Sequence, residues 1–588
     1  MNAAPDADSS SGIRGEAAEW AVVGGGVGGR PTAPGRLAEA LAEALGGELV
    51  ADGEGLAAAL SAGGRRHVVY APTRRAGGPP EEAAAAVLAA LAAAPVERVV
   101  VLSSAEVYGP HHHNDLYFAE DAYPARPHAN RLAVRWRRFE AAAESAFAGR
   151  RERLVVLRPA PVPLAGGEDF WSRFLLGRGP AATLPGHDPT IQLLALDDLV
   201  AAVRRAAAAP GGGPYNVVPA GAVPVRRALR LAGRRRLALP RLAQEAARRL
   251  ARTAEPAERL GYLRYGWTAD GGRAAAELGF TAGATSAQAA AAAAGRPLPE
   301  PPPGFDAFGY DPEYVAAFGR TLFRFLHDAW WRIEVRGLEN VPRRGRAVLA
   351  GVHRGFMPWD GVMSLHHLVR EVGRPPRFML HPTLLKFPFL FNYMTKLGGV
   401  PACQANADRI LGADGLLAIF PEGIRGAFTP YRRAYKLGKF GRDEYVRMAL
   451  RNRAPIVPFV TVGSAEIYPI LARLDWGWLK RYLEWPYLPI TPTFPWLPVP
   501  LPSKWHTRWL EPLHVEEMHG PEAADDPEVV KRLSREVRRR MTEAIGEMLV
   551  RRRSIWYGTV FDDEPAERRE RKPAEAAEAA AVGTPGPR

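Results

Sequence analysis

Short apolar runs alternate with alanine-rich stretches through the first half of the chain. The runs are rich in Val and Leu and are bounded by turn residues, which is typical of buried strands. The stretches between them suit helices. Strands that alternate with helices predict βαβ units and a parallel sheet. The predicted strand segments occupy residues 21–23, 48–50, 67–72, 98–109 and 154–159.

The second half is less regular. Residues 314–331 carry apolar side chains near helical spacing, among them Phe318, Leu322 and Phe325. We expect this helix to pack on its own domain, with contact to a bilayer as the alternative. The apolar run of residues 454–465 ends at Glu466 and predicts a buried strand followed by a turn. No run approaches the roughly 18 uncharged residues that a membrane-spanning helix needs.

Length and composition predict two domains, because 588 residues exceed what one hydrophobic core normally supports. The boundary is predicted at a proline-rich, extended linker. The two ends of the chain are polar and are predicted to be disordered. The predicted division is 1–17 disordered, 18–296 first domain, 297–310 linker, 311–561 second domain and 562–588 disordered.

A net charge of +14 and an isoelectric point near 9.9 imply an anionic partner. The chain has no helix-turn-helix, zinc-finger spacing or aromatic RNA-binding motif, so we expect no nucleic acid partner. An anionic membrane surface is the favoured partner, and a merely solvated basic surface is the alternative. The amino terminus lacks the pattern of a signal peptide. We therefore expect a cytoplasmic protein, peripheral on the inner face of the cell membrane.

Six tryptophans gather between residues 468 and 510, among prolines, tyrosines and cations. Amphipathic rings beside cations suit the headgroup layer of a bilayer. This region is the predicted site of membrane contact. The tryptophans are Trp476, Trp478, Trp485, Trp496, Trp505 and Trp509.

Two segments of the second half carry candidate chemistry. His353 and Asp360 could serve as a general base and its orienting partner. The segment Phe420 to Gly426 could hold an anion, because Arg425 offers a planar donor fork and Gly423 lets the backbone approach a ligand. A base near an anion clamp is the arrangement needed to acylate a hydroxyl on a phosphorylated acceptor.

Four ordered blocks in residues 311–561 resemble the glycerolipid acyltransferases, the superfamily that includes lysophosphatidic acid acyltransferase. They are His353 with Asp360, residues 399–409 ending in Asp408-Arg409, residues 420–425, and Ala454 to Pro458. The resemblance implies transfer of a fatty acyl group from acyl-CoA or acyl carrier protein to a lysophosphatidate-like acceptor, without metal. It implies His353 and Asp360 as catalytic residues. The implied acceptor-binding residues are Arg409, Glu422, Gly423 and Arg425.

The first block departs from the family pattern. Six residues separate His353 from Asp360, where the family usually has four, and Pro358 is among them. We expect this longer loop to bulge outward. It resembles branches that acylate diacylglycerol or other neutral acceptors, so the acceptor stays open. The alternative is that His353 is a loop histidine and Asp360 a helix N-cap.

A glycine-rich turn follows the first predicted strand. Gly24, Gly26 and Gly29 fit the spacing of a dinucleotide-binding turn, and Asp52 follows after the next strand. Such a turn cradles a pyrophosphate with backbone N–H groups, so NAD or NADP could bind here. Pro31 and the proline at 34 delay the following helix to about residue 36.

The first domain resembles the extended short-chain dehydrogenase/reductases, the NAD-dependent epimerase/dehydratase family. The predicted fold class is therefore α/β, with a Rossmann-like doubly wound parallel sheet followed by an α/β acyltransferase domain. That family uses a Tyr with a Lys four positions later. Here residues 130–136 lack both, and Ser103, Ser104 and Tyr108 remain without the lysine. We expect a redox-inactive domain that binds a nucleotide. An epimerase or oxidoreductase, or a nucleotide- or lipid-responsive binding protein, is the alternative.

Overall fold

A computed structural model of the chain describes most of its length as two compact units. The first unit is Met1–Pro312 with Pro382–Asn406, and the second is Glu313–His381 with Ala407–Arg588. The domain limits predicted from the sequence stay predictions. The described residues are 19–24, 35–50, 56, 60, 66–72, 81–112, 114–122, 130–210, 212–219, 221–240, 242–244, 258–297, 308–381, 384, 387–441, 443–478, 481, 485–496 and 499–561.

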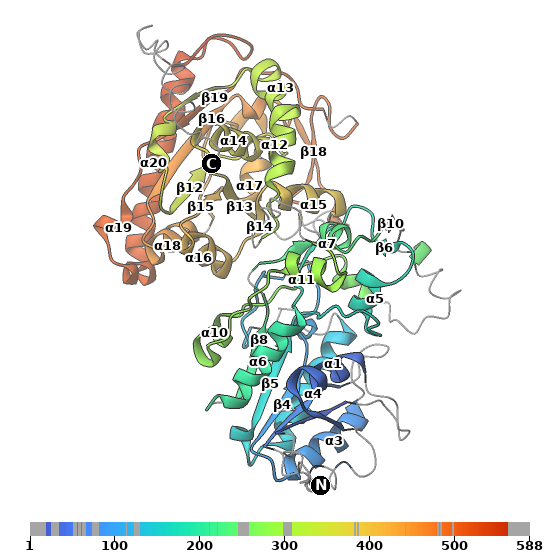
Figure 1. The fold of residues 1–588 in the computed structure, drawn as a ribbon. Helices are drawn as coiled ribbons and strands as arrows, with labels where there is room; N and C mark the ends of the chain where they lie inside the picture. Colours follow the sequence, from blue (N-terminus) through green and yellow to red (C-terminus); the bar gives the residue numbers. More distant parts are fainter. Residues whose placement is uncertain are drawn as a thin grey trace, which may run out of the picture. The chain divides into compact units, whose positions relative to one another are not determined.

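A six-stranded parallel sheet organises the first unit (Figure 1). Its order is β2-β1-β3-β4-β5-β8, and every described pairing is parallel. The inner strands are buried almost throughout, as expected for a parallel sheet covered on both faces. The strands are β1 (Trp20–Val23), β2 (Glu48–Val50), β3 (His67–Tyr70), β4 (Arg98–Leu102), β5 (Leu154–Pro159) and β8 (Gly213–Val217).

Helices pack on this sheet in two pairs, α1 with α6 and α3 with α4. They are α1 (Arg36–Leu45), α3 (Glu81–Ala93), α4 (Arg131–Ala146) and α6 (Leu196–Ala208). In α1 the buried Ala38, Leu41 and Leu45 recur at helical spacing, which explains its docking. The fold is Rossmann-like, as the alternating pattern predicted. The expected start of the first helix near residue 36 is confirmed.

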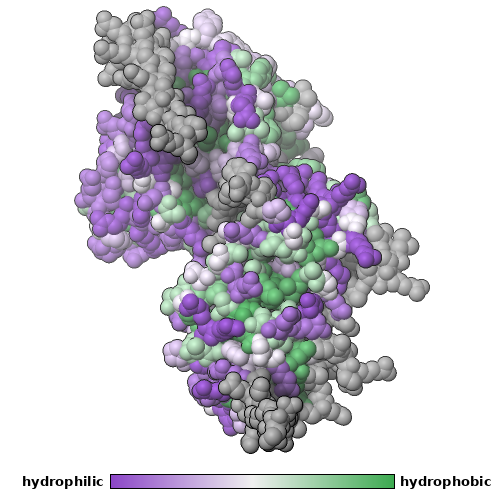
Figure 2. All heavy atoms as spheres, in the orientation of Figure 1, coloured by the Kyte–Doolittle hydropathy of each residue, from purple (hydrophilic) through white to green (hydrophobic). Residues whose placement is uncertain are grey.

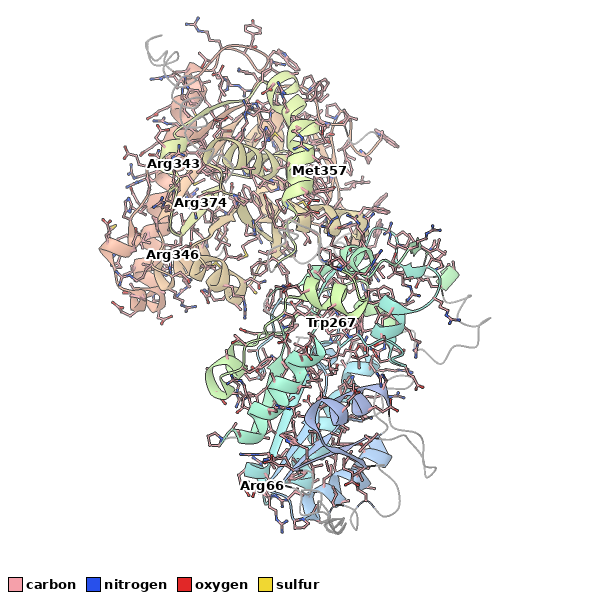
Figure 3. The ribbon with its side chains drawn as sticks, viewed as in Figure 1. Arg66, Trp267, Arg343, Arg346, Met357 and Arg374 are labelled. Carbon is pink, nitrogen blue, oxygen red and sulfur yellow. The ribbon has the colours of Figure 1, made fainter. Side chains whose placement is uncertain are left out.

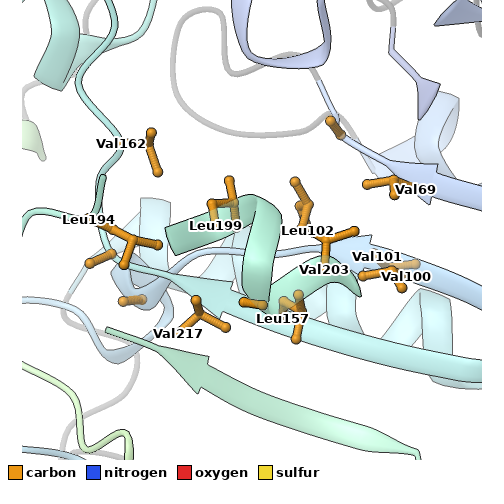
Figure 4. Packing of buried hydrophobic residues seen from close by; sticks show 14 of the residues in the cluster. Val69, Val100, Val101, Leu102, Leu157, Val162, Leu194, Leu199, Val203 and Val217 are labelled. Atoms are coloured by element: carbon orange, nitrogen blue, oxygen red, sulfur yellow. The ribbon is translucent and has the colours of Figure 1, made fainter. Parts of the chain in front are cut away.

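Part of the core of this unit lies between the sheet and α6. Leu199 and Val203 of α6 lie over Leu102 of β4 and Leu157 of β5 (Figure 4). All four side chains are fully buried. Burying a side chain of this size stabilises a fold by roughly 1.5–3 kcal/mol, so the sheet's register depends on these contacts.

Smaller elements complete the first unit. Strands β6 (Ala181–Thr183) and β10 (Arg236–Ala238) pair in parallel, and β7 (Thr190–Ile191) pairs with β9 (Val223–Pro224) in antiparallel fashion. The remaining helices are α5 (Phe170–Leu176), α7 (Val225–Leu231), α9 (Arg259–Tyr262), α10 (Gly272–Leu278), α11 (Ser286–Ala293) and α15 (Pro388–Lys396).

A mixed seven-stranded sheet runs in the order β11-β19-β16-β12-β15-β13-β14. The central β12 pairs in parallel with β15 and with β16, whereas β16 and β19 are antiparallel. The predicted buried strand near residue 456 is therefore confirmed as β16. The strands are β11 (Glu334–Arg336), β12 (Ala347–Gly351), β13 (Pro376–Leu380), β14 (Gly399–Pro401), β15 (Leu416–Ile419), β16 (Ile456–Val462) and β19 (His506–Trp509), with a separate hairpin of β17 (Ala472–Leu474) and β18 (Leu488–Ile490).

The longest helix of the second unit is α20 (Pro527–Arg551), which packs against β16 and α18. Its start follows from local chemistry, because the Asp526 side chain accepts bonds from two backbone N–H groups and Pro527 holds the first helical position. The other helices are α12 (Pro312–Arg320), α13 (Leu322–Phe325), α14 (Trp359–His367), α16 (Gln404–Gly412), α17 (Ile424–Ala427), α18 (Glu444–Arg451) and α19 (Val515–Met518), with π-helical turns η4 (Leu326–Trp330) and η6 (Leu368–Val372).

Hydrophilic residues cover most of the visible face of the second unit, while hydrophobic residues reach more of the visible face of the first (Figure 2). The Trp-rich region divides in two. Trp476, Trp478 and Trp496 are exposed, and Trp496 keeps 87% of its surface. Trp505 and Trp509 are fully buried, and Trp505 stacks on Trp331 at 4.4 Å between ring centroids. The last two therefore belong to the core and not to a membrane surface.

Candidate active site

The candidate base lies directly beyond the carboxyl end of β12, the central strand of the mixed sheet. Val352 follows the strand, His353 comes next, and α14 begins at Trp359. Loops at the carboxyl ends of parallel strands are common positions for functional side chains, because the rigid sheet holds them in place.

His353 and Asp360 are hydrogen-bonded. The Nδ1 atom of His353 lies 2.7 Å from Oδ1 and 3.0 Å from Oδ2 of Asp360. A carboxylate can only accept, so Nδ1–H donates and the other ring nitrogen, Nε2, carries the lone pair. The imidazole is 15% exposed, whereas the Asp360 side chain is fully buried. The pair has the geometry of a base held by its orienting carboxylate.

The backbone around Asp360 fixes that carboxylate further. Arg354 N–H donates to Oδ2 at 2.7 Å, and Gly361 N–H donates to Oδ1 at 2.9 Å. Asp360 lies in the first turn of α14, and the N-cap position belongs to Pro358. The alternative that Asp360 serves as the helix N-cap is therefore wrong.

The loop between the two residues folds inward, and the expected outward bulge is wrong. Gly355 has φ 78°, and a Cβ there would lie 2.4 Å from the Ser464 carbonyl, so only glycine fits. Phe356 has φ 60° and is buried. The loop ends with Met357 (Figure 3) and Pro358 before α14. The two additional residues thus make room for a buried aromatic side chain.

Phe356 packs in an aromatic cluster, which we call the Phe356 cluster. Its centroid lies 5.2 Å from that of Phe428, 5.2 Å from that of Trp485 and 4.8 Å from that of Phe494. Aromatic pairs at such distances stabilise a fold beyond the area that they bury. This packing compensates for the unfavourable backbone of Phe356 and anchors the loop that carries His353.

The segment from Phe420 follows β15, the strand next to β12. The Phe420 ring lies 5.2 Å from that of His353. Gly423 has φ 56° and ψ −150°, a conformation that favours glycine, and it is exposed. Arg425 in α17 is exposed as well. The structure therefore brings His353, Gly423 and Arg425 to the carboxyl ends of two adjacent strands.

Glu422 and Arg409 are placed differently. Glu422 is buried and its carboxylate pairs with Arg354 at 2.7 Å. Arg409 lies in the last turn of α16, which leads into the amino end of β15. His353 and Phe420 follow the carboxyl ends of their strands, so the structure places Arg409 toward the opposite edge. Sequence reasoning missed Arg354, although its position next to His353 was a signal.

The Gly-rich turn of the first unit is described only at its start. Gly24 follows β1, and its N–H donates to the Val50 carbonyl at 3.1 Å. Gly26, Gly29 and Asp52 lie outside the described residues. A pocket at the carboxyl ends of β1 and β3 is lined in part by Gly35, Arg36, Ala71 and Pro72. This is where the strand order of the sheet reverses, the usual place for a ligand in such folds.

Buried polar groups surround Tyr108, which follows β4 in the first unit. The Tyr108 hydroxyl donates to Asn216 at 2.7 Å and accepts from Arg158 at 3.0 Å. Arg158 in turn makes a two-pronged bond to Glu140, at 3.0 and 2.8 Å. Burial raises the pKa of the Tyr108 phenol above its ordinary value. Asn130 caps α4 with its side-chain oxygen. The network therefore holds the proton of the Tyr108 hydroxyl in its hydrogen bond to Asn216.

One group among the described residues has metal-ligand spacing. Ligand atoms of His514, Glu516 and Glu517 lie within 4.8 Å of one another, and two of the three residues are exposed. His514 also bonds directly to Glu516 at 3.0 Å. The group is remote in sequence from the His353 loop and from the Phe420 segment.

Comparison with known proteins identifies the second unit. A family model described as Acyltransferase matches residues 332–462, which include His353, Asp360 and Arg425. An uncharacterized protein of Mycobacterium tuberculosis is 38% identical over 259 residues, which are 43% of this chain and 72% of that protein. The chain belongs to the acyltransferase family. The match confirms the resemblance inferred from the ordered blocks.

Other relatives of this acyltransferase have names that state an activity. Phytyl ester synthase 1 of Arabidopsis thaliana is 32% identical over 171 residues, 28% of this chain and 23% of that protein. A DGAT1/2-independent enzyme synthesizing storage lipids of Bos taurus is 26% identical over 177 residues, 30% of this chain and 52% of that protein. The acyltransferase is thus similar to lipid acyltransferases.

Solved structures similar to part of this chain include MoeE5 in complex with UDP-glucuronic acid and NAD. It is 21% identical, its TM-score is 0.35, and the match covers 47% of this chain and 98% of that chain. Across the described part of the acyltransferase, no helix is both long and apolar enough to cross a bilayer.

Proposed function

We propose that the second unit transfers a fatty acyl group from acyl-CoA or acyl carrier protein to the hydroxyl of a lipid. The hydrogen bond of 2.7 Å between His353 and Asp360 carries this proposal. It fixes the imidazole so that Nε2 can accept a proton, and the partly exposed ring can be reached from solvent.

In the proposed reaction, the acceptor oxygen attacks the thioester carbonyl while His353 Nε2 takes the hydroxyl proton. The buried Asp360 stabilises the imidazolium that forms. The attack forms the new C–O bond and gives a tetrahedral intermediate, and collapse of that intermediate restores the C=O bond and breaks the C–S bond. His353 then returns its proton to the departing sulfur, so that the products are an ester and a free thiol.

The acceptor is proposed to be a lysophosphatidate-like lipid. Arg425 is exposed and next to the turn of Gly423, a position from which a guanidinium can hold a phosphate. The names of the Arabidopsis and Bos taurus relatives point instead to an apolar alcohol or a storage lipid. The two acceptors differ in the need for a cation, so Arg425 can decide between them.

The deciding experiment incubates the purified full chain with labelled acyl-CoA and four acceptors: lysophosphatidate, glycerol 3-phosphate, diacylglycerol and a long-chain alcohol. For a phosphorylated acceptor, Arg425→Ala is expected to raise KM by about 10–100-fold, the range for a hydrogen bond to a charged group. The exposed Arg433, which lies outside the block, provides the matched variant Arg433→Ala with unchanged KM.

Two results would overturn parts of this proposal. Label in no acceptor with the wild-type chain would contradict acyl transfer. Label in diacylglycerol or the alcohol, with no effect of Arg425→Ala, would contradict the phosphorylated acceptor and leave the transfer chemistry standing.

For the first unit we propose NAD or NADP binding without redox turnover. The pocket at the carboxyl ends of β1 and β3 supports binding, and the locked Tyr108 hydroxyl argues against proton transfer. Titration of the chain with NADH, followed by nucleotide fluorescence, tests binding. Reduction of NAD on addition of a nucleotide sugar would show that the first unit is an oxidoreductase.

Attachment to an anionic membrane surface is a further part of the proposal. The exposed Trp476, Trp478 and Trp496, together with the net charge of +14, support it. Trp505 is excluded from this role because it is buried.

We expect the chain to sediment with anionic liposomes at low salt and to be partly released at high salt. Replacing Trp476 and Trp496 by Ala should weaken the salt-resistant part. Tyr557→Ala is the matched control, because Tyr557 is exposed but lies outside the Trp-rich region. A wild-type chain that stays in the supernatant at low salt would contradict membrane attachment.

A further inference from the structure

The residue after the candidate base is a buried arginine. Arg354 keeps 1% of its surface exposed, and its guanidinium meets the carboxylate of Glu422 with two bonds, Nη1 to Oε2 at 2.7 Å and Nη2 to Oε1 at 3.2 Å. A two-pronged pair of this kind fixes the relative orientation of its partners as well as their distance. It therefore joins the loop of His353 to the segment that carries Gly423 and Arg425.

The guanidinium of Arg354 also reaches four backbone carbonyls, one of which is that of Lys436, 3.5 Å from Nη2. Nη1 donates to the carbonyl of His353 at 2.8 Å and lies 3.4 Å from that of Gly426, and Nε donates to the carbonyl of Ala434 at 2.5 Å. One planar group thus contacts the base's own peptide, the residue after Arg425 and a third loop.

The backbone of Arg354 acts on the same site. Its N–H donates to Asp360 Oδ2 at 2.7 Å, while its side chain binds the carbonyl of His353. The peptide between the base and Arg354 is therefore held from both sides. A shift of Arg354 must move His353 relative to Asp360.

Glu422 is the other partner of this buried pair and lies on the segment that carries Gly423 and Arg425. It precedes Gly423 and is buried, and it accepts from Gly438 N–H at 2.6 Å in addition to Arg354. Its two oxygens are occupied by protein donors, which leaves the exposed Gly423 and Arg425 for a ligand.

We propose that Arg354 is a positioning residue for acyl transfer, which sets the distance between the base at His353 and the anion clamp at Gly423 and Arg425 through its pair with Glu422. The inference rests on the proposed function of the second unit. Lysine cannot replace it, because an ammonium lacks the planar fork that reaches Glu422 and the carbonyls of His353 and Ala434 together.

The test compares Arg354→Lys with the wild-type full chain in the labelled acyl-CoA assay, using the acceptor that the panel identifies. We expect kcat to fall by about 10²-fold, the size of the loss when reacting groups are displaced by about 1 Å. The acceptor KM should rise in the same variant, because base and clamp share the pair. Glu422→Gln, which keeps the shape but not the charge, should produce the same two changes.

A matched control separates positioning from stability. Arg552 and Glu466 form another buried pair in this unit, 2.5 Å apart and with 6% and 4% of their side chains exposed. Arg552→Lys should lower the Tm as Arg354→Lys does, with kcat and KM within about twofold of wild type. Circular dichroism and thermal melts show which variants are folded.

The double variant Arg354→Met/Glu422→Leu covers the case in which the single variants do not fold. Buried ion pairs can often be replaced by apolar residues without loss of stability. We expect a folded chain that still shows the loss in kcat. A folded double variant, or a folded Arg354→Lys, with wild-type kcat and KM would overturn the positioning role. If His353→Ala also keeps full activity, the proposed function itself fails.

Discussion

Polar side chains gather near the carboxyl ends of parallel strands in both units, but their partners differ. In the first unit, Tyr108 is held between Asn216 and Arg158, and Arg158 is paired with Glu140. In the second, Asp360 holds His353 through Nδ1, and the ring keeps 15% of its surface exposed. The first arrangement stabilises the fold, because the charges of Arg158 and Glu140 are paired in the buried interior.

The second arrangement leaves one nitrogen of a fixed base for chemistry. Its rigidity comes from neighbours that do not react, namely the Phe356 cluster and the pair of Arg354 with Glu422. The two units thus use buried polar pairs differently. In the first unit the Tyr108 hydroxyl is bound on both sides, whereas in the second unit the pairs hold the loop of His353 and leave its ring partly exposed.

The largest expected effect is on the base. His353→Ala should lower kcat/KM for acyl transfer by about 10²–10⁴-fold, the usual cost of losing a general base. The fold should survive, because the buried Asp360 carboxylate keeps two backbone N–H donors, from Arg354 and Gly361, when the imidazole is removed. The labelled acyl-CoA assay checks this, with His519→Ala as a control histidine in another loop. Wild-type rates in folded His353→Ala would show that His353 is not the base, and the contrast drawn between the two units would then be wrong.

The next largest effect concerns the buried network of Tyr108, Arg158 and Glu140 in the first unit. Arg158→Met leaves Glu140 charged and buried, and should cost the first unit about 3–5 kcal/mol of unfolding free energy. Arg131→Met is the control, since 90% of the Arg131 side chain is exposed and its loss should change stability by about 0.5 kcal/mol or less. Denaturant titration measures both. A loss below about 1 kcal/mol for Arg158→Met would show that the network is not a source of stability.

Acid should weaken the second unit. Burial lowers the pKa of His366 to about 4, and the neighbouring His367 and His327 are also shifted down. Between pH 4 and pH 6.5 the unfolded chain therefore binds more protons than the folded chain. The stability that comes from burying these histidines in the neutral form is complete above about pH 6.5 and is lost as the pH falls toward 4. We expect His366→Leu to reduce the loss of unfolding free energy between pH 6.5 and pH 4 by about 2 kcal/mol. Equal slopes for variant and wild type in pH-dependent denaturation would contradict it.

The smallest expected effect is at Tyr108. Tyr108→Phe removes one hydroxyl between Asn216 and Arg158 and should cost about 1 kcal/mol, the typical net worth of a buried hydrogen bond. Because no proton transfer is expected there, the reduction of added NAD should be absent in both wild type and variant. Absorbance at the NADH band after addition of nucleotide sugars measures this, and a signal lost in Tyr108→Phe would assign the residue a redox role.

Local patterns were sufficient for much of the fold. The apolar runs at residues 67–70, 98–102 and 154–159 became β3, β4 and β5, because a strand buried on both faces must be apolar along its length. The ordered blocks around His353 and Phe420 indicated the family, since the blocks follow one another along the chain in the order of the family's motifs. These features depend on neighbours in sequence, which a pattern records directly.

Contacts between distant residues were decided only in the tertiary structure. Glu422 was predicted to bind the acceptor, yet its partner is Arg354, 68 residues away. Trp505 and Trp496 look alike in sequence, but one lies under Trp331 and the other in solvent. Burial and pairing of such side chains depend on which elements pack together, and a side chain's own residue type does not specify that. The sequence thus determined the strands and the candidate site residues, and packing determined which charged side chains are left for a ligand.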